Sequence, residues 1–95
     1  MSFNFHGELL EHKATAAEVL ENADLSAFSD YSSIDCDHDN YGLEVEGLAS
    51  QQKVNQVTQL LRKAFPNWRH INYWEEGNGF TVRISRDLEK RSRGF

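Results

Sequence analysis

The clearest pattern of apolar and polar positions lies over residues 50–65. Apolar side chains recur there at the three- and four-residue spacing of one helix face, at Val54, Val57, Leu61 and Ala64. Ser50 is a suitable N-cap, and Pro66 disfavours helical geometry at the residue before it. The pattern therefore predicts an amphipathic helix whose apolar face belongs to the core.

A β-hairpin is predicted after this helix, with strands over residues 68–75 and 80–86 around Gly77, Asn78 and Gly79. Whichever two of these residues form the turn, alternation places the same side chains on each face. The predicted core face carries Ile71, Tyr73, Phe80, Val82 and Ile84. The opposite face carries Trp68, His70, Asn72, Trp74, Thr81, Arg83 and Ser85.

A second hairpin is predicted upstream, from residues 31–36 and 41–48 with a turn over residues 37–40. Thr15 and Glu18 have the spacing of a capping box, which predicts a short helix over residues 16–23. For the beginning of the chain two interpretations compete. Alternation of Phe3 and Phe5 favours an initial strand, whereas Leu9 and Leu10 favour a helix that extends back through these two residues.

These elements predict an α+β fold in a single domain spanning residues 1–95. Two helices pack on one face of a mostly antiparallel sheet of four or five strands, in the order β-α-β-β-α-β-β or α-β-β-α-β-β. Residues 88–95 are expected to form a mobile basic tail. Cys36 is the only cysteine, and no segment has the apolar run of a membrane span or a secretion signal. A cytoplasmic location is expected.

The two halves of the chain carry opposite charge. Residues 1–50 contain eleven acidic residues against one basic residue, a net charge of −10, and residues 51–95 contain nine basic against four acidic, a net charge of +5. Such asymmetry indicates a polarised surface, which steers charged partners.

The acidic turn of the first hairpin has the spacing of a calcium loop, with oxygen ligands offered by Asp35, Asp37, Asp39 and Glu46. The context argues against calcium, because such a loop needs flanking helices and here strand alternation follows. A solvated turn is the preferred interpretation, and neither metal nor cofactor is expected. Cys36 and His38 are two residues apart, but no third group completes a catalytic set, so the chain is expected not to be an enzyme.

Function is instead expected from the polar face of the second hairpin. Tryptophan and arginine concentrate binding energy at protein interfaces, and acidic neighbours select a basic partner. The predicted binding residues are Trp68, His70, Asn72, Trp74, Arg83, Glu44 and Glu46. They indicate a non-enzymatic protein-binding module, a small acidic inhibitor or regulator by analogy with those of phage or plasmid origin and not from a motif.

Three alternatives remain open at this stage. The same aromatic residues with the basic tail are compatible with binding single-stranded nucleic acid, although Glu44 and Glu46 would repel phosphates. A homodimer that joins the positive half to the negative half is compatible with the charge pattern. Finally, Trp68 and Trp74 would be buried if the N-terminal segment covered them as a second small core.

Overall fold

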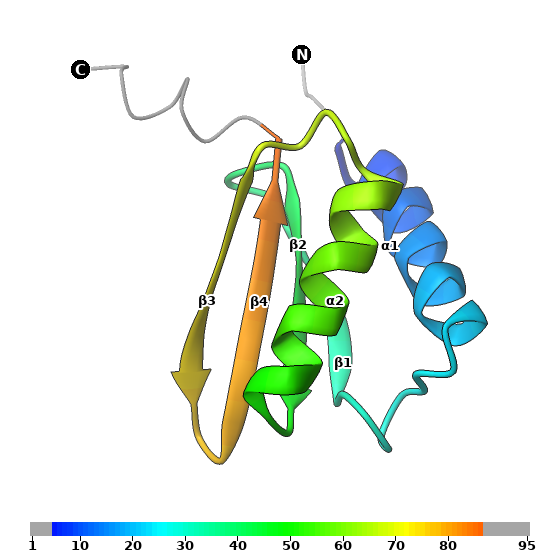
Figure 1. The fold of residues 1–95 in the computed structure, drawn as a ribbon. Coiled ribbons are helices and arrows are strands. Elements are labelled where there is room, and N and C mark those ends of the chain that lie inside the picture. The colour runs from blue at the N-terminus through cyan, green and yellow to red at the C-terminus, as the bar shows by residue number, and fades with distance from the viewer. Residues whose placement is uncertain (1–4, 87–95) are drawn as a thin grey trace.

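Two helices cover one face of a four-stranded antiparallel sheet in the computed structural model, which describes residues 5–86 (Figure 1). The elements follow one another as α1 (Phe5–Asn22), β1 (Ser33–Asp37), β2 (Gly42–Leu48), α2 (Gln51–Ala64), β3 (His70–Glu76) and β4 (Gly79–Ser85). The strands lie in the order β1-β2-β4-β3. The predicted α+β fold is confirmed, in the order that begins with a helix. The expected tail at residues 88–95 lies outside the described residues.

The predicted initial strand is wrong at Phe5, which belongs to the helix α1 that continues to Asn22, whereas Phe3 lies outside the described residues. The buried positions of α1, Leu9, Ala16 and Leu20, follow helical spacing and face the core. Thr15 does not cap a helix. It lies within α1, where its hydroxyl donates a hydrogen bond of 3.1 Å to the carbonyl oxygen of Glu11, one turn earlier.

The amphipathic helix α2 is confirmed. The Ser50 hydroxyl accepts a hydrogen bond of 3.3 Å from the backbone N–H of Lys53, and the Phe65 N–H closes the last turn on the Leu61 carbonyl at 2.8 Å. Val54, Val57 and Leu61 are buried. The two hydrogen bonds define the ends of α2, and the buried side chains pack it on the core.

Both predicted hairpins are present. β1 and β2 pair from Ser33 with Glu46 to Asp37 with Gly42. β3 and β4 pair without interruption from His70 with Ser85 to Glu76 with Gly79. Gly77 has a φ of +62°, which suits the first central position of a type II′ turn.

The pairing of β2 with β4 joins the two hairpins into one sheet. Its register shifts between Val45 and Leu48, at a bulge where Gly47 has a φ of +78°. α1 lies over β1 and β2, and α2 lies mainly over β4. The core therefore forms between the helices and the two central strands.

The predicted core face of the second hairpin is only partly buried. Val82 and Ile84 on the central strand β4 are fully covered, whereas Ile71 and Phe80 are half-buried and Tyr73 keeps 48% of its surface exposed. Tyr73 lies on β3, the strand at the edge of the sheet, where α2 does not reach over it. Alternation identifies the face of a strand, but the helix layer decides how deeply that face is buried.

Candidate functional site

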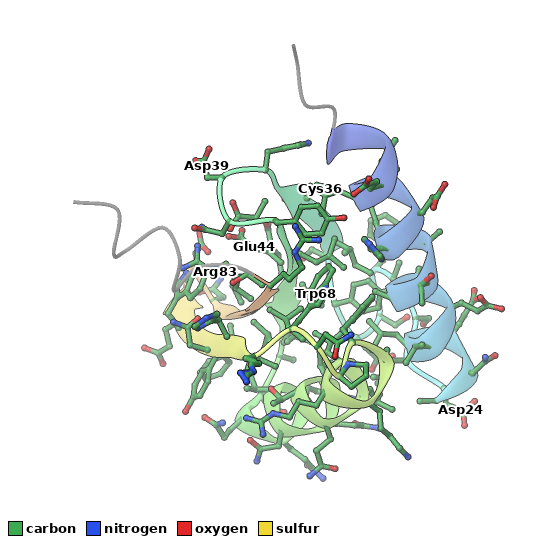
Figure 2. All side chains as sticks on the ribbon, turned by 90° about the horizontal axis from the view of Figure 1, so that it is seen from above. Asp24, Cys36, Asp39, Glu44, Trp68 and Arg83 are labelled. Atoms are coloured by element: carbon green, nitrogen blue, oxygen red, sulfur yellow. The ribbon has the colours of Figure 1, made fainter. Side chains whose placement is uncertain are left out.

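The face of the sheet away from the helices carries most of the charged side chains that the sequence singled out. We call it the open sheet face. Its ionisable and aromatic members, placed by the observed register, are Asp35, Asp37, Glu44, Glu46, His70, Trp74, Glu76 and Arg83. Figure 2 shows Glu44 and Arg83 on the side of the molecule away from α1. Four strands thus contribute to one surface that no described helix covers.

Arg83 lies at the centre of the open sheet face, because its strand β4 runs between β2 and β3. Its Nη1 atom lies 3.4 Å from Oδ2 of Asp37 and 3.8 Å from Oε2 of Glu44. Its guanidinium carbon also lies 5.4 Å from the centre of the Trp74 ring, a cation–π distance. Arg83 therefore connects the aromatic side of the face to its acidic side.

The carboxylates of β1 and β2 are crowded. Asp35 lies directly opposite Glu44 in the register. The pKa of Glu46 is raised to about 7, because its protonated carboxyl group donates a hydrogen bond to the Asp35 side chain and because burial and neighbouring negative charge disfavour ionisation. Burial and the charge of Asp37 also raise the pKa of Glu44. Like charges directly opposite on a sheet destabilise the fold, so this arrangement opposes stability.

Trp74 is held in place by its neighbour Glu76. Its indole N–H donates a hydrogen bond of 3.1 Å to Oε1 of Glu76, and the Thr81 hydroxyl donates to the same oxygen at 3.0 Å. A hollow of about 440 Å³ opens beside this group, with Glu46, Gly47 and Glu76 among its lining residues. The half-buried indole is thus oriented on the open sheet face before any partner arrives.

Trp68 is not on the open sheet face, and its predicted outward orientation is wrong. It is 8% exposed and packs against Phe65, His12 and Tyr41, with ring centroids 4.5, 5.0 and 5.8 Å away. Trp68 precedes the first residue of β3, so strand alternation does not apply to it. Trp68 is thus buried against α1, but it belongs to the main core and not to a second small one. Trp74 lies on the other side of the sheet.

The calcium-loop spacing does not bring its residues around one point. Asp37 accepts a hydrogen bond of 2.9 Å from the Asn40 side chain and faces Arg83, while Asp39 lies in the exposed turn of a β-hairpin. Within residues 5–86, no three His, Cys, Asp or Glu side chains are arranged to hold a metal ion. The acidic residues of this segment divide between a turn and the open sheet face.

Cys36 and His38 do not share a strand. Cys36 belongs to β1 and is half-buried on the helix side of the sheet, where it packs against the core. His38 lies beyond the end of β1, in the exposed turn. The arrangement gives Cys36 a packing role.

Asp35, Asp37 and Glu76 belong to the open sheet face although the sequence did not assign them to the binding set. A signal was present, since Asp35 and Asp37 alternate with the inward-facing Ile34 and Cys36. Alternation places Glu76 on the same face as His70, but Glu76 lies one residue beyond the end of the predicted strand. The acidic part of the face is therefore larger than expected.

A second acidic surface lies on the outer side of α1, where Glu11, Glu18 and Glu21 are exposed. No basic residue occupies the last turn of this helix. Because α1 packs on the opposite side of the sheet, this surface is separate from the open sheet face. Substitutions of its glutamates remove the same negative charge and therefore serve as controls.

Neither of the two helices in residues 5–86 combines the length and apolar character needed to cross a lipid bilayer. Comparison of the chain with protein-family models, with curated proteins and with solved structures found no match.

Proposed function

We propose that this chain is a non-enzymatic protein-binding module, a small acidic inhibitor or regulator that engages a basic partner protein through the open sheet face. The observation that carries the proposal is the convergence of carboxylates from three strands on one face without helix cover. They are Asp35, Asp37, Glu44, Glu46 and Glu76. Arg83 is the one lysine or arginine on this face within the described strands.

The crowding of these carboxylates supports a binding role. Asp35 opposite Glu44 weakens the β1–β2 pairing, and Glu46 keeps a proton into the neutral pH range. Lysine or arginine side chains of a partner would remove this repulsion, so part of the binding energy comes from strain already present in the free protein. The same charge raises the rate of encounter with a basic surface.

Trp74 and Arg83 supply the centre of the proposed interface. Both residue types are enriched among the side chains that dominate binding energy. The hydrogen bond from Trp74 to Glu76 and the position of Arg83 over the indole restrict both side chains in advance. Less side-chain entropy is then lost when a partner binds.

Two observations weigh against the nucleic-acid alternative. Trp68 is buried and is not available to stack on a base, and Arg83 already faces the carboxylates of Asp37 and Glu44. The remaining carboxylates would repel a phosphate backbone, whose neutralisation supplies most of the affinity in such complexes. The basic residues after Arg86 lie outside the described part of the chain, so this alternative stays a prediction.

The proposal is tested by comparing three immobilised baits in one cell lysate. The first is the wild-type chain, the second is Asp35→Asn with Glu44→Gln, and the third is Glu18→Gln with Glu21→Gln on α1. The second and third baits lose the same formal charge from opposite sides of the molecule. Proteins retained at low salt are identified by mass spectrometry.

We expect a basic protein that the wild-type and α1 baits retain and the sheet bait loses. Its purified form should then bind Trp74→Ala at least tenfold more weakly than wild type, as expected for a central tryptophan. Identical protein sets on all three baits would contradict the proposal. A mobility shift of random single-stranded DNA by the wild-type chain at low salt would favour the alternative instead.

We also propose a cytoplasmic location. Cys36 is the only cysteine of the chain, and it packs against the core as a free thiol, so the fold draws no stability from an oxidising compartment.

A further inference from the structure

The outer edge of β3 is open to pairing. β3 is the terminal strand of the sheet beside β4, and no strand of the described chain pairs with its other edge. Proteins commonly protect such edges with a bulge, a proline or a lysine. β3 contains neither proline nor lysine, and its register with β4 is unbroken over seven residues.

The register identifies which backbone groups of β3 point outward. Glu76 and Gly79 are the first and last residues of the turn, so they form a hydrogen-bonded pair facing inward. Alternation then directs the N–H and C=O groups of Ile71, Tyr73 and Glu75 away from β4. These groups form a regular edge of three donor and acceptor pairs.

The side chains beside this edge are apolar at the centre. Tyr73 is 48% exposed and Ile71 is half-buried. A groove of about 310 Å³ runs between them and α2, with Val54, Thr58 and Arg62 on the helix side. Covering the groove would remove from water the exposed ring of Tyr73 and the half-buried side chain of Ile71.

The charges along β3 have opposite signs at its two ends. Arg69 precedes the strand, whereas Glu75 and Glu76 end it. Arg62 lines the groove beside Ile71, near the basic end. Neither Arg62 nor Glu75 has an ion-pair partner within residues 5–86. An identical strand running antiparallel would bring unlike charges together at both ends.

We propose that β3 pairs antiparallel with β3 of a second copy of this chain, about a twofold axis at Tyr73, and so joins two four-stranded sheets into one. Tyr73 then pairs with Tyr73 of the second copy, and Ile71 pairs with Glu75 of the second copy. That second pairing places the Glu75 carboxylate on the helix side of the sheet, beside the groove where Arg62 lies. The occupant of the groove is thus the same segment of the same protein.

This dimer is compatible with the proposed function without resting on it. Asp35, Asp37, Glu44 and Glu46 lie on β1 and β2, the strands farther from the β3 edge. The dimer therefore leaves them accessible. Each dimer presents two acidic surfaces to partners. The dimer is tested by molar mass and the function by capture of a partner, so failure of either proposal leaves the other standing.

The test is the molar mass in solution, measured by light scattering and by sedimentation over a concentration series. The monomer has a mass of 10.9 kDa, and we expect twice this value for the wild-type chain at micromolar concentration. Arg62→Glu and Glu75→Lys should each raise the dimer dissociation constant by about tenfold, because two contacts per dimer become repulsive. The double variant restores opposite charges and should restore the dimer.

Two control variants separate pairing from stability. Lys63→Glu changes the same charge in the last turn of α2 but lies outside the groove, so the dimer should persist. Glu75→Pro removes an outward N–H that β4 does not use, whereas Glu75→Thr keeps it, so only the proline variant should lose the backbone pairing. Circular dichroism checks that each variant is folded.

A wild-type chain that remains monomeric throughout the series overturns the proposal. A dimer that the reversed charges leave unchanged overturns it as well, since it must then form elsewhere. If the folded wild-type chain is monomeric and Glu75→Pro alone abolishes capture of a foreign protein, the edge instead receives a strand of that partner.

Discussion

The indole of Trp68 stacks on the ring of Phe65, with ring centroids 4.5 Å apart and 22° between their planes. Phe65 is the C-cap residue of α2, and His12 of α1 meets the same indole edge-on at 5.0 Å. Trp68 therefore ties both helices to the segment that leads into β3. Its contribution is to folding, whereas that of Trp74 is proposed for binding.

Replacing each tryptophan by alanine should separate these roles. Trp68→Ala removes a buried ring and should lower the free energy of unfolding by about 3–5 kcal/mol. Trp74→Ala removes a half-buried ring and one exposed hydrogen bond, and should cost about 1 kcal/mol. Urea denaturation measures both values. Equal losses would contradict the assignment of the two residues to different environments.

Intrinsic fluorescence should report the same difference without destabilising the protein as strongly. In Trp74→Phe the remaining Trp68 should emit at shorter wavelength, because it is enclosed by aromatic rings. In Trp68→Phe the remaining Trp74 should emit at longer wavelength and be quenched by iodide. Blue-shifted emission from Trp74 would remove it from the proposed interface.

Gly47 and Gly77, the two glycines of residues 5–86 that have positive φ, should differ in their sensitivity to substitution. At Gly77 a Cβ atom meets nothing within 4 Å, so Gly77→Ala should cost about 1–2 kcal/mol from backbone strain alone. At Gly47 a Cβ atom would lie 1.9 Å from the Ser32 hydroxyl oxygen, so Gly47→Ala adds a steric clash. Thermal or urea unfolding should show a loss of roughly 3 kcal/mol or more there.

Stability should fall as pH rises towards neutrality because of Glu46. Its pKa rises from the ordinary value of 4.5 to about 7 in the folded protein, mainly through the hydrogen bond with Asp35. The folded state therefore holds this proton more tightly than the unfolded chain does. The resulting stabilisation is complete below pH 4.5 and is lost as the pH passes through about 7.

Glu46→Gln should flatten this part of the curve of unfolding free energy against pH, because glutamine does not titrate. Glu18→Gln, an exposed change on α1, serves as the control and should leave the curve as it is in the wild type. A curve that Glu46→Gln does not alter would contradict the raised pKa of Glu46 and its hydrogen bond with Asp35.

The sequence was sufficient to predict both hairpins and α2, because local signals define each of them. Ser50 caps α2, and Gly77 permits the turn that pairs Glu76 with Gly79. The beginning of α1 was ambiguous since Phe3 and Phe5 fit two periods at once. Only the continuous helix from Phe5, with Leu9 buried against the core, decides between them.

The candidate site was predictable only where strand alternation applies. Trp74, Arg83 and Glu44 face outward as expected, since all three lie within paired strands. Trp68 was misplaced because its position in a loop depends on long-range packing against His12 and Tyr41, which no local pattern contains. The pairing of Asp35 opposite Glu44 required the register between β1 and β2.

The pairing of β2 with β4 has a consequence for the order in which the chain folds. Each hairpin closes through contacts near in sequence, which form quickly, whereas β2 meets β4 only after α2 and β3 have been traversed. We therefore expect docking of the two hairpins beneath α2 to be the slow event. Substitutions at Val45 or Val82, which face each other in this pairing, should retard refolding more than equally buried changes at Leu9.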